Sequence, residues 1–233
     1  MSKVPKSLIL LSGGLDSVAN LHIADRSYED LLALTINYNQ KSYVQELKAA
    51  QYFAQKIGVE HIVIDVPWFS HWQGKELGLI HGNASVPTEE LDLNSKRQCE
   101  KSADEVWVPN RNALFIHLAA AYAEMHGISQ IYVGFNLEEA QTFPDNSKAF
   151  LNSINESLVF STRSKVQVLC PTIDMTKKEI VQKSMLYDVN FEKIWPCYQA
   201  GETPCGKCES CLRFIRATHG LVYVQWIEEL KKS

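Results

Sequence analysis

The sequence predicts an α/β protein with a doubly wound, parallel five-stranded sheet and a small cysteine-rich module at its C-terminal end. Short apolar runs alternate with segments of helical periodicity, as repeated strand–helix–strand units do. A Ser-Gly-Gly-x-Asp-Ser turn at residues 12–17 separates the first apolar run from the first helix. Four of the six cysteines lie between Cys197 and Cys211. We therefore expect a sheet domain over residues 1–190 and a metal-binding module with a C-terminal helix over residues 191–233.

Five apolar runs are the expected strands. They cover residues 7–11, 31–36, 61–66, 130–134 and 166–169. The second run, Leu-Leu-Ala-Leu-Thr-Ile, is apolar almost throughout, which is typical of a strand covered on both faces. Because helices separate the runs, we expect parallel pairing with right-handed crossovers.

Apolar residues at helical spacing predict the helices. They cover residues 16–25, 43–57, 112–126, 145–160 and 223–230. Gly58 is placed to end the second helix. Thr176 and Glu179 have the spacing of a capping box at the start of a further helix. From residue 67 to about 105 the periodicity fades, and a long irregular segment of this kind is more often a lid or substrate loop than filler.

Composition narrows the class of protein. The chain has 233 residues, 45% hydrophobic content and a net charge of −4. It can bury a sizeable core, and it lacks the basic footprint typical of nucleic-acid binding. The apolar run after the N-terminus is too short for a signal peptide, and no stretch approaches the length of a membrane helix. We expect a cytoplasmic protein that does not act at a membrane.

The turn at residues 12–17 has the chemistry of an anion site. Gly13 and Gly14 allow close approach of backbone N–H groups to a ligand, and the following helix points its positive end into the turn. Ser12 and Ser17 add hydroxyl groups. Asp16 repels phosphate unless a cation bridges them, which suggests Mg²⁺. The turn lacks the Gly-Lys-Ser/Thr of a Walker loop. The simpler alternative is an ordinary strand–helix turn with Asp or Ser as the cap.

The cysteine spacing indicates a metal site. Cys197, Cys205, Cys208 and Cys211 form a C-x7-C-x2-C-x2-C pattern. Four thiolates can close a tetrahedral, structural Zn²⁺ site. An iron–sulfur cluster is the competing occupant, and four free thiols are a weaker alternative. Cys170 ends a strand and is expected in the core, whereas Cys99 falls in the expected lid.

Further polar residues follow the expected strands, where ligands of parallel sheets gather. Those after the second and fourth strands are Tyr38, Gln40, Asn136, Glu138, Glu139 and Asp145. Arg111 could clamp a phosphate or carboxylate or lie exposed. Asn112 could be only a helix cap. Lys177 and Lys178 open a helix where a cation is unfavourable unless it faces an anion; solvated helix charge is the alternative.

Taken together, these motifs resemble one family of enzymes. The Ser12–Ser17 turn resembles the signature loop of PP-loop ATP pyrophosphatases, which have the adenine nucleotide alpha-hydrolase-like, Rossmann-like fold. Over nearly the full length the chain resembles the 7-cyano-7-deazaguanine synthase family. The matching motifs are Ser12-Gly-Gly-Leu-Asp16-Ser17, Tyr38-x-Gln40, Val108-Pro-x-Arg111-Asn112, Phe143-Pro144-Asp145, Thr176-Lys177, Cys197-Tyr198, the Cys-Gly-x-Cys-x-x-Cys tail and Arg213.

The resemblance implies a reaction. The family adenylates the carboxylate of 7-carboxy-7-deazaguanine with ATP, forms the amide with ammonia, and dehydrates it to the nitrile with a second ATP, in the queuosine and deazapurine pathway. It implies ATP, Mg²⁺ and Zn²⁺, and a homodimer is expected. The implied catalytic residues are Asp16, Ser17, Arg111 and Lys177. The implied ATP-binding residues are Ser12, Gly13, Gly14, Leu15, Asp16, Ser17, Tyr38 and Gln40. The implied substrate-binding residues are Asn112, Glu139, Phe143 and Asp145. The implied zinc ligands are Cys197, Cys205, Cys208 and Cys211.

The chain departs from the family pattern on the substrate side. The family commonly has Asp followed by Tyr-Pro-Asp-Cys-Arg, whereas this chain has Glu139 followed by Phe143-Pro144-Asp145-Asn146-Ser147. This departure suggests a divergent member that stops at the amide or uses another amine, even one on a macromolecule. A different PP-loop ligase, such as a tRNA thiolase, and a nucleotide sensor without turnover are the remaining alternatives. A thiolase would need a catalytic cysteine pair and a basic surface.

Overall fold

A five-stranded, all-parallel sheet forms the centre of the molecule. The computed structural model describes residues 7–27, 30–71, 77–80, 86 and 91–230. The strands are β1 (Ser7–Leu10), β2 (Leu31–Asn37), β3 (Glu60–Asp65), β4 (Gln130–Tyr132) and β5 (Gln167–Leu169). Their order across the sheet is β3-β2-β1-β4-β5, with every pair parallel. The strand order reverses beside β1, so the predicted doubly wound sheet is confirmed.

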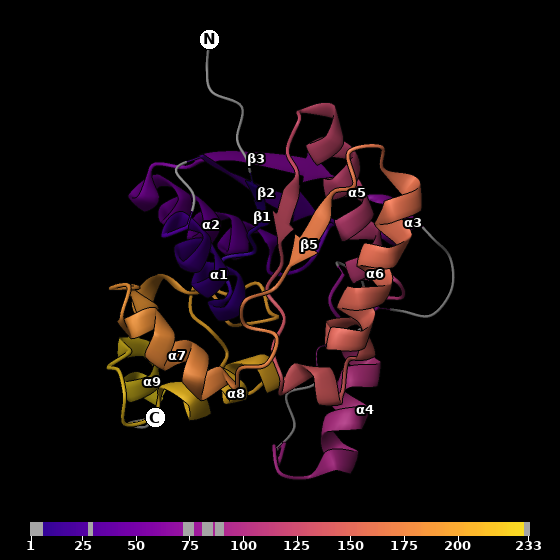
Figure 1. Ribbon diagram of the computed structural model, residues 1–233. Helices are drawn as coiled ribbons and strands as arrows, with labels where there is room; N and C mark the ends of the chain where they lie inside the picture. Colours follow the sequence, from indigo (N-terminus) through magenta and orange to yellow (C-terminus); the bar gives the residue numbers. More distant parts are fainter. Residues whose placement is uncertain (1–6, 28–29, 72–76, 81–85, 87–90, 231–233) are drawn as a thin grey trace.

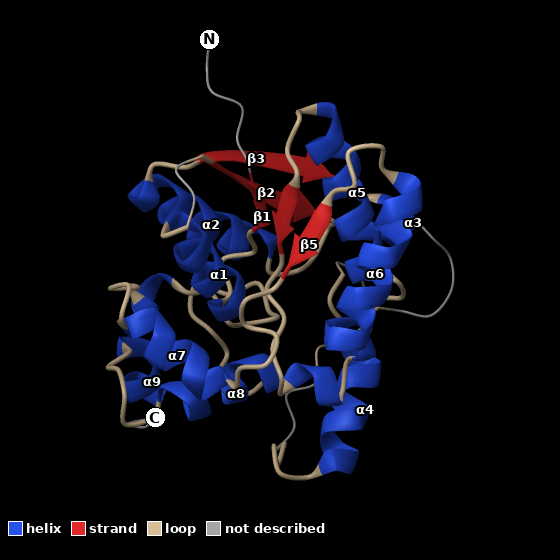
Figure 2. Cartoon of the chain, in the orientation of Figure 1, coloured by secondary structure: helices blue, strands red, loops and turns tan. Residues whose placement is uncertain are grey.

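Helices cover both faces of this sheet (Figures 1 and 2). The longer ones are α1 (Leu15–Asp25), α2 (Tyr43–Ile57), α4 (Lys96–Val106), α5 (Arg111–Met125), α6 (Lys148–Ser161), α7 (Lys177–Met185) and α8 (Glu209–Thr218). Two short helices are α3 (Trp68–His71) and α9 (Gln225–Leu230). Single 3-10 turns occupy η1 (Glu139–Gln141), η2 (Pro144–Asn146) and η3 (Phe191–Lys193). No helix in these described ranges is both long enough and apolar enough to cross a membrane.

The core lies in two layers because successive strand residues point to opposite faces. Leu8 packs in the layer with Ile116 of α5 and Leu158 of α6. Its neighbour Ile9 packs in the other layer, with α1, α2 and α7. The C-terminal segment contributes to both layers. Phe214 and Trp226, which stack with ring centroids 6.0 Å apart, belong to the α1 layer, and three of the clustered cysteines belong to the α5 layer.

Two glycines allow the chain to fold tightly at the carboxyl ends of the strands. Gly13 has a φ of 78°, and a Cβ there would lie 2.5 Å from the Ala49 Cβ of α2. Gly134 follows β4, and a Cβ there would lie 2.7 Å from the Ser17 backbone nitrogen. A side chain at either position would push the turn between β1 and α1 out of place. The backbone of α1 can therefore approach both β4 and α2.

Some sequence expectations were wrong in detail. The segment from residue 67 to 105 was expected to be irregular, but its described part includes α3 and most of α4, in which Cys99 is buried. Residues 72–76, 81–85 and 87–90 of the expected lid lie outside the described residues. The strong amphipathic character of α4 was hidden by its many charged residues. The helix α8 (Glu209–Thr218) was not predicted, because it begins within the cysteine motif. The remaining longer helices and the strands agree with expectation to within a few residues.

The two helices on the α5 side begin differently from expectation. Asn112 is the second residue of α5 and not its cap, because Asn110 occupies the cap position with a φ of 59°. The helix α6 begins at Lys148 and not at residue 145, because Pro144–Asn146 forms a 3-10 turn. The Ser147 hydroxyl accepts a hydrogen bond from the Phe150 backbone N–H at 3.1 Å. Ser147 is therefore a helix cap.

Candidate active site

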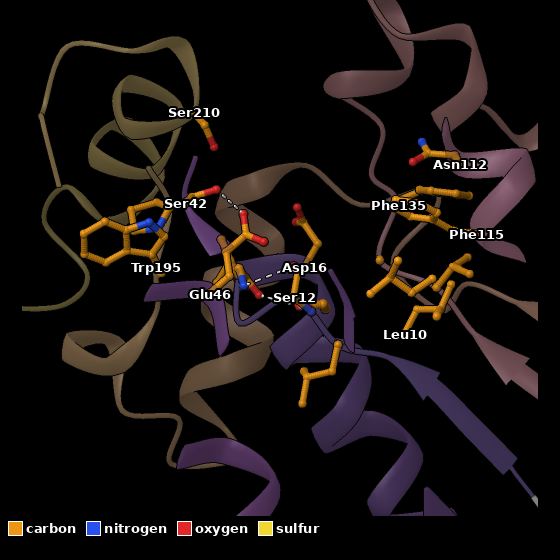
Figure 3. A pocket seen from close by; sticks show the side chains of 18 of the residues that line it. Leu10, Ser12, Asp16, Ser42, Glu46, Asn112, Phe115, Phe135, Trp195 and Ser210 are labelled. Atoms are coloured by element: carbon orange, nitrogen blue, oxygen red, sulfur yellow. Dashed lines mark hydrogen bonds between the residues drawn. The ribbon is translucent and has the colours of Figure 1, made fainter. Parts of the chain in front are cut away.

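A cavity of about 260 Å³ lies at the carboxyl ends of β1, β2 and β4. Its wall includes the turn after β1, the ends of β2 and β4, the first turns of α2, α5 and α7, the segment between η3 and α8, and part of α8. Figure 3 shows Ser42, Glu46 and Trp195 on one side of it, Asn112, Phe115 and Phe135 on the other, and Asp16 and Ser12 between them. This is the edge where ligands of open parallel sheets bind.

Most, though not all, of the residues proposed from the sequence line this cavity. Those that do are Ser12, Gly14, Leu15, Asp16, Ser17, Tyr38, Arg111, Asn112, Glu139 and Lys177. Among the described residues, Gly13, Gln40, Phe143 and Asp145 are not part of its lining. Gln40 shapes the turn after β2, where its side-chain oxygen accepts from the Tyr38 backbone N–H at 2.9 Å. Phe143 stacks on Trp107 with the ring planes 11° apart.

The turn at residues 12–17, here called the glycine loop, is held by its own serines. The Ser17 hydroxyl donates to the Gly14 carbonyl at 3.0 Å, and the Ser12 backbone N–H donates to the Ser17 hydroxyl at 3.3 Å. Gly14 is the cap residue of α1 and has no side chain with which to cap the helix. The positive end of α1 therefore faces the cavity without a side-chain cap, an arrangement that favours a phosphate group.

A buried cluster of opposite charges lies beside the glycine loop. The Lys177 ammonium group contacts Asp16 Oδ2 at 2.5 Å and Glu139 Oε1 at 2.8 Å. The Asn136 side-chain amide donates to the same Asp16 oxygen at 3.3 Å. The lysine and Asp16 are nearly fully buried, with exposures of 6% and 9%. Three elements far apart in the sequence thus meet at one point: the start of α1, η1 after β4, and the start of α7.

The cluster divides its protons unequally. The pKa of the Asp16 carboxyl is raised to about 6. Burial is the largest cause, and the nearby Glu139 charge raises the pKa further, while the Lys177 charge lowers it. Burial also raises the pKa of Glu139, but the Lys177 charge and hydrogen bond outweigh it and leave the pKa lowered. Burial lowers the pKa of Lys177, yet the two carboxylates reverse this and raise it. Lys177 therefore stays cationic, while Asp16 titrates closest to neutrality.

Asp16 has one oxygen free for a further ligand. Its Oδ1 is buried and has no hydrogen-bond partner among the described residues, whereas Oδ2 is shared by Lys177 and Asn136. An unpaired buried carboxylate oxygen is costly. A hard divalent cation, which takes oxygen ligands, fits this position.

The opposite wall, here called the α5 side, consists of Tyr38, Arg111, Asn112 and Asn146. The Arg111 guanidinium lies 5.8 Å from the centroid of the Tyr38 ring and donates to its hydroxyl at 3.3 Å. Asn146 is buried, and its side-chain amide donates to the Asp145 carboxylate at 3.2 Å. A cation, an aromatic ring and two amides can recognise a planar, polar molecule carrying an anionic group.

Glu46 and Trp195 are among the lining residues that the sequence analysis did not propose. Glu46 lies on α2, where its carboxylate accepts from the Ser42 hydroxyl at 2.6 Å and the Gln40 amide at 2.9 Å. The sequence does contain an indication of Glu46: it is an acidic residue on the apolar face of an amphipathic helix, three positions before the buried Ala49. Trp195 lies just before the first clustered cysteine, and its backbone N–H donates to the Gly13 carbonyl at 3.0 Å. No sequence motif marks that contact.

The four clustered cysteines can hold a metal ion. The Sγ atoms of Cys197, Cys205, Cys208 and Cys211 all lie within 4.8 Å of one another. Tetrahedral Zn²⁺ with Zn–S bonds of about 2.3 Å needs sulfur atoms roughly 3.8 Å apart. Backbone N–H groups of Gln199 and Cys205 point at the Cys197 sulfur, each at 3.3 Å. Such N–H groups stabilise thiolates. The four sulfur atoms therefore fit a structural metal ion that has no open coordination position.

The other two cysteines lie apart from this cluster. Cys170 is buried directly after β5, as expected, and hydrogen-bonds with the backbone of Phe135. Cys99 is buried in α4. Burial raises the pKa of both thiols, which disfavours a thiolate at either position.

Comparisons with known proteins agree with one another. The model of the family described as queuosine biosynthesis protein QueC matches residues 6–220. A 7-cyano-7-deazaguanine synthase from Bdellovibrio bacteriovorus is 42% identical over 218 residues, which cover 93% of this chain and 94% of that protein. A protein of the same name from Methanosarcina mazei is 41% identical over 216 residues, covering 91% and 93%.

Two solved structures that the chain matches are more distant in sequence. NMN synthetase from Francisella tularensis is 14% identical with a TM-score of 0.47, covering 98% of this chain and 83% of that one. NH3-dependent NAD synthetase from Campylobacter jejuni is 15% identical with a TM-score of 0.47, covering 83% of this chain and 68% of that one.

Proposed function

Because the chain belongs to the family of queuosine biosynthesis protein QueC, we propose that it is an ATP-dependent C–N ligase that makes 7-cyano-7-deazaguanine. Its substrates are 7-carboxy-7-deazaguanine, ATP and ammonia. The observation that carries the proposal is the buried Lys177 between Asp16 and Glu139, directly beside the glycine loop. With a divalent cation bound to its carboxylates, such a site can offset part of the charge of a triphosphate and bring a second anion close to it.

The first step joins two anions. The substrate carboxylate oxygen attacks the α-phosphorus of ATP, the bond from that phosphorus to the bridging oxygen breaks, and pyrophosphate leaves. We assign pyrophosphate to the glycine loop, with the N–H groups of α1 and the hydroxyls of Ser12 and Ser17. Lys177 faces the charge that develops at the α-phosphate, and Arg111 faces the substrate carboxylate. Alignment and charge neutralisation of this kind lower a barrier without a covalent nucleophile on the protein.

The later steps form the amide and then repeat the activation with a second ATP. Ammonia attacks the acyl carbon of the adenylate, AMP leaves, and a proton is released, which gives the amide. The amide oxygen then attacks the α-phosphorus of a second ATP and displaces pyrophosphate, with release of one amide proton. Loss of AMP and of the second amide proton leaves the nitrile. Tyr38, Asn112 and Asn146 hold the deazapurine, with Asp145 behind them. The balance is two AMP and two pyrophosphate for each nitrile.

Two metal ions belong to the proposal. We assign Mg²⁺ to the free oxygen of Asp16 with help from Glu139, where it supplies charge neutralisation for the phosphates. We assign Zn²⁺ to the four clustered cysteines, where it holds the C-terminal segment in place. The homodimer, the cytoplasmic location and the division into residues 1–190 and 191–233 stay predictions from the sequence.

The direct test combines the purified protein with ATP, Mg²⁺, ammonia and 7-carboxy-7-deazaguanine. We expect mass spectrometry to detect the nitrile, with two AMP released per nitrile. Absence of carboxylate-dependent AMP and pyrophosphate release would overturn the proposal.

The presence of Asn146 in the cavity wall favours two alternatives to nitrile formation with ammonia. An amide side chain there stands at the position where the family commonly has a cysteine, so the site could stop at the amide or accept a different amine. Accumulation of amide with one AMP per turnover would support the first variant. Activation by ATP without capture by ammonia would support an amine acceptor on another molecule.

A further inference from the structure

Glu138 joins the start of α7 to α8. Its Oε1 accepts a hydrogen bond from the Lys177 backbone N–H at 2.9 Å. Its Oε2 accepts from the Arg216 guanidinium at 2.6 Å and lies 3.6 Å from that of Arg213. The side chain of Glu138 is 19% exposed, and the residue is not among the described residues that line the cavity. Glu138 therefore acts on other residues and not on a ligand.

Two successive carboxylates thus fix a single lysine. Glu138 holds the backbone of Lys177, and Glu139 holds its ammonium group. The N–H group that Glu138 accepts belongs to the first residue of α7, one of the helix positions without an internal partner. Movement of Glu138 would therefore shift the lysine relative to Asp16.

The other end of this connection is anchored in the metal-binding module. Arg213 is 6% exposed, and its guanidinium donates twice to the Glu209 carboxylate, at 3.0 and 2.6 Å. Glu209 directly follows Cys208, and Arg213 is two residues after Cys211. The first turns of α8 therefore carry two metal ligands and both members of a buried ion pair. A metal bound to the cysteines would fix the position from which Arg213 reaches Glu138.

The same module touches the cavity at a second point. The Trp195 backbone N–H donates to the Gly13 carbonyl, and Cys197 is part of the cavity wall. The module therefore meets the nucleotide side of the cavity through the glycine loop and through Lys177.

We propose that Glu138 is a positioning residue that ties the orientation of Lys177 to α8, so that metal binding at the cysteines and nucleotide binding in the cavity strengthen each other. The inference rests on the proposed function only in that a nucleotide binds in this cavity. Coupling between two sites is reciprocal, because each ligand must change the affinity of the other by the same factor. Either ligand can therefore be used to measure it.

The experiment uses the full chain loaded with Zn²⁺. A chromogenic chelator reports the rate of zinc release, with and without the non-hydrolysable analogue α,β-methylene-ATP and Mg²⁺. We expect the analogue to slow zinc release. Where the rate of zinc uptake is unchanged, this slowing equals the gain in zinc affinity, which should be roughly 5- to 150-fold, the usual range of coupling between sites. Calorimetry on the same samples measures analogue binding. Failure to bind would contradict the proposed function, whereas binding without an effect on zinc release would overturn only this inference.

Glu138→Gln tests the residue itself. Glutamine keeps an oxygen that can accept from the Lys177 N–H but loses the charge that pairs with the arginines. We expect the variant to bind the analogue and to lose the slowing of zinc release, while its kcat falls and its KM for ATP changes little. Full coupling in this variant would overturn the assignment.

Glu179→Ala is the matched control. The Glu179 carboxylate accepts from the Thr176 N–H and hydroxyl, both at 2.8 Å, and so stabilises the start of the same helix. It is exposed, and its hydrogen bonds among the described residues are with Thr176 and not with α8. We expect a lower melting temperature and intact coupling. Equal loss of coupling in this control would reduce the role of Glu138 to helix capping and overturn the proposal.

Discussion

The glycine-loop side of the cavity comes mainly from one short stretch of chain, whereas the α5 side comes from three distant ones. On the first, the six consecutive residues 12–17 follow β1 and form a tight turn and a helix N-terminus, and Lys177 completes this side. On the second, Tyr38 follows β2, Arg111 and Asn112 begin α5, and Asn146 ends a 3-10 turn. The first side is a local motif, and the second exists only in the folded chain.

This difference separates what the two sides can do. Backbone N–H groups and a fixed cation recognise phosphate, which all nucleotide substrates share. Side chains gathered from separate segments recognise one particular molecule and can change one at a time. Damage to the first side should therefore reduce turnover of every substrate, and damage to the second should change affinity for the carboxylate alone. The following predictions test that division.

The largest effect is expected from Lys177→Met. Its loss leaves Asp16 and Glu139 buried without their cation, and kcat/KM for pyrophosphate release should fall by roughly 10²–10³-fold. Lys178→Met, an exposed lysine on the same helix, is the control and should retain nearly full activity. Lys177→Arg keeps the charge and separates lost catalysis from lost folding. A fall of less than about tenfold in Lys177→Met would contradict the role assigned to the cation.

The next effect is expected from Gly134→Ala. The new Cβ would lie 2.7 Å from the Ser17 backbone nitrogen, so the glycine loop must shift. Displacements approaching 1 Å can cost up to about 10²-fold in rate, and steady-state kinetics should show this loss in kcat. Gly58→Ala is the control, because its φ of 81° strains the chain although nothing lies within 4 Å of the new Cβ. It should lower the melting temperature and leave kcat unchanged.

A smaller and more selective effect is expected on the α5 side. Asn146→Ala removes a buried amide from the cavity wall and should raise the KM for 7-carboxy-7-deazaguanine by about tenfold, the value of one hydrogen bond to a polar ligand. The KM for ATP should stay near its original value. Its neighbour Ser147 caps α6, so Ser147→Ala should cost about 1 kcal/mol of stability without changing either KM. An equal rise in both KM values for Asn146→Ala would contradict the assignment of ATP and the carboxylate substrate to different sides of the cavity.

The smallest effect concerns pH. The pKa of Asp16 is about 6, so kcat/KM should fall as pH decreases through that value, because the protonated acid loses its attraction for cations. The Glu139 charge is one of the causes that raise this pKa. Glu139→Gln should therefore move the acidic limb of the pH profile to lower pH, whatever its effect on the maximum rate. An unmoved limb, or one displaced to higher pH, would show that another group controls it.

The local motif was predictable and the long-range contacts were not. The spacing of residues 12–17 indicated a strand, a turn and a helix N-terminus, because glycine and serine at those positions serve backbone geometry that any strand–helix turn of this kind needs. The cysteine spacing indicated a metal site because the four ligands lie within one short segment of the sequence. The capping box at Thr176 and Glu179 is confirmed. In each of these cases the residues that matter are neighbours in the sequence.

The contacts that complete the cavity depend on how distant segments pack. Glu138 resembles any solvated acid after a strand, and only the approach of α8 brings Arg216 and Arg213 to it. Arg111 could equally have been exposed, and its place beside Tyr38 depends on the crossing of α5 over the sheet. In the sequence, Ser147 resembled part of a substrate motif. In the structure it follows a 3-10 turn and is the N-cap residue of α6.

The hydrogen bond from the Trp195 N–H to the Gly13 carbonyl has a consequence for how the protein is made. The glycine loop leaves the ribosome early, and the segment that walls its cavity leaves only after all five strands. A nascent chain that has reached α7 already carries the signature turn but has an open site where Trp195, Cys197 and Phe214 will later lie. We therefore expect competence to bind a nucleotide to arise late in synthesis, and a fragment that ends after the sheet to contain the motif without the complete cavity wall.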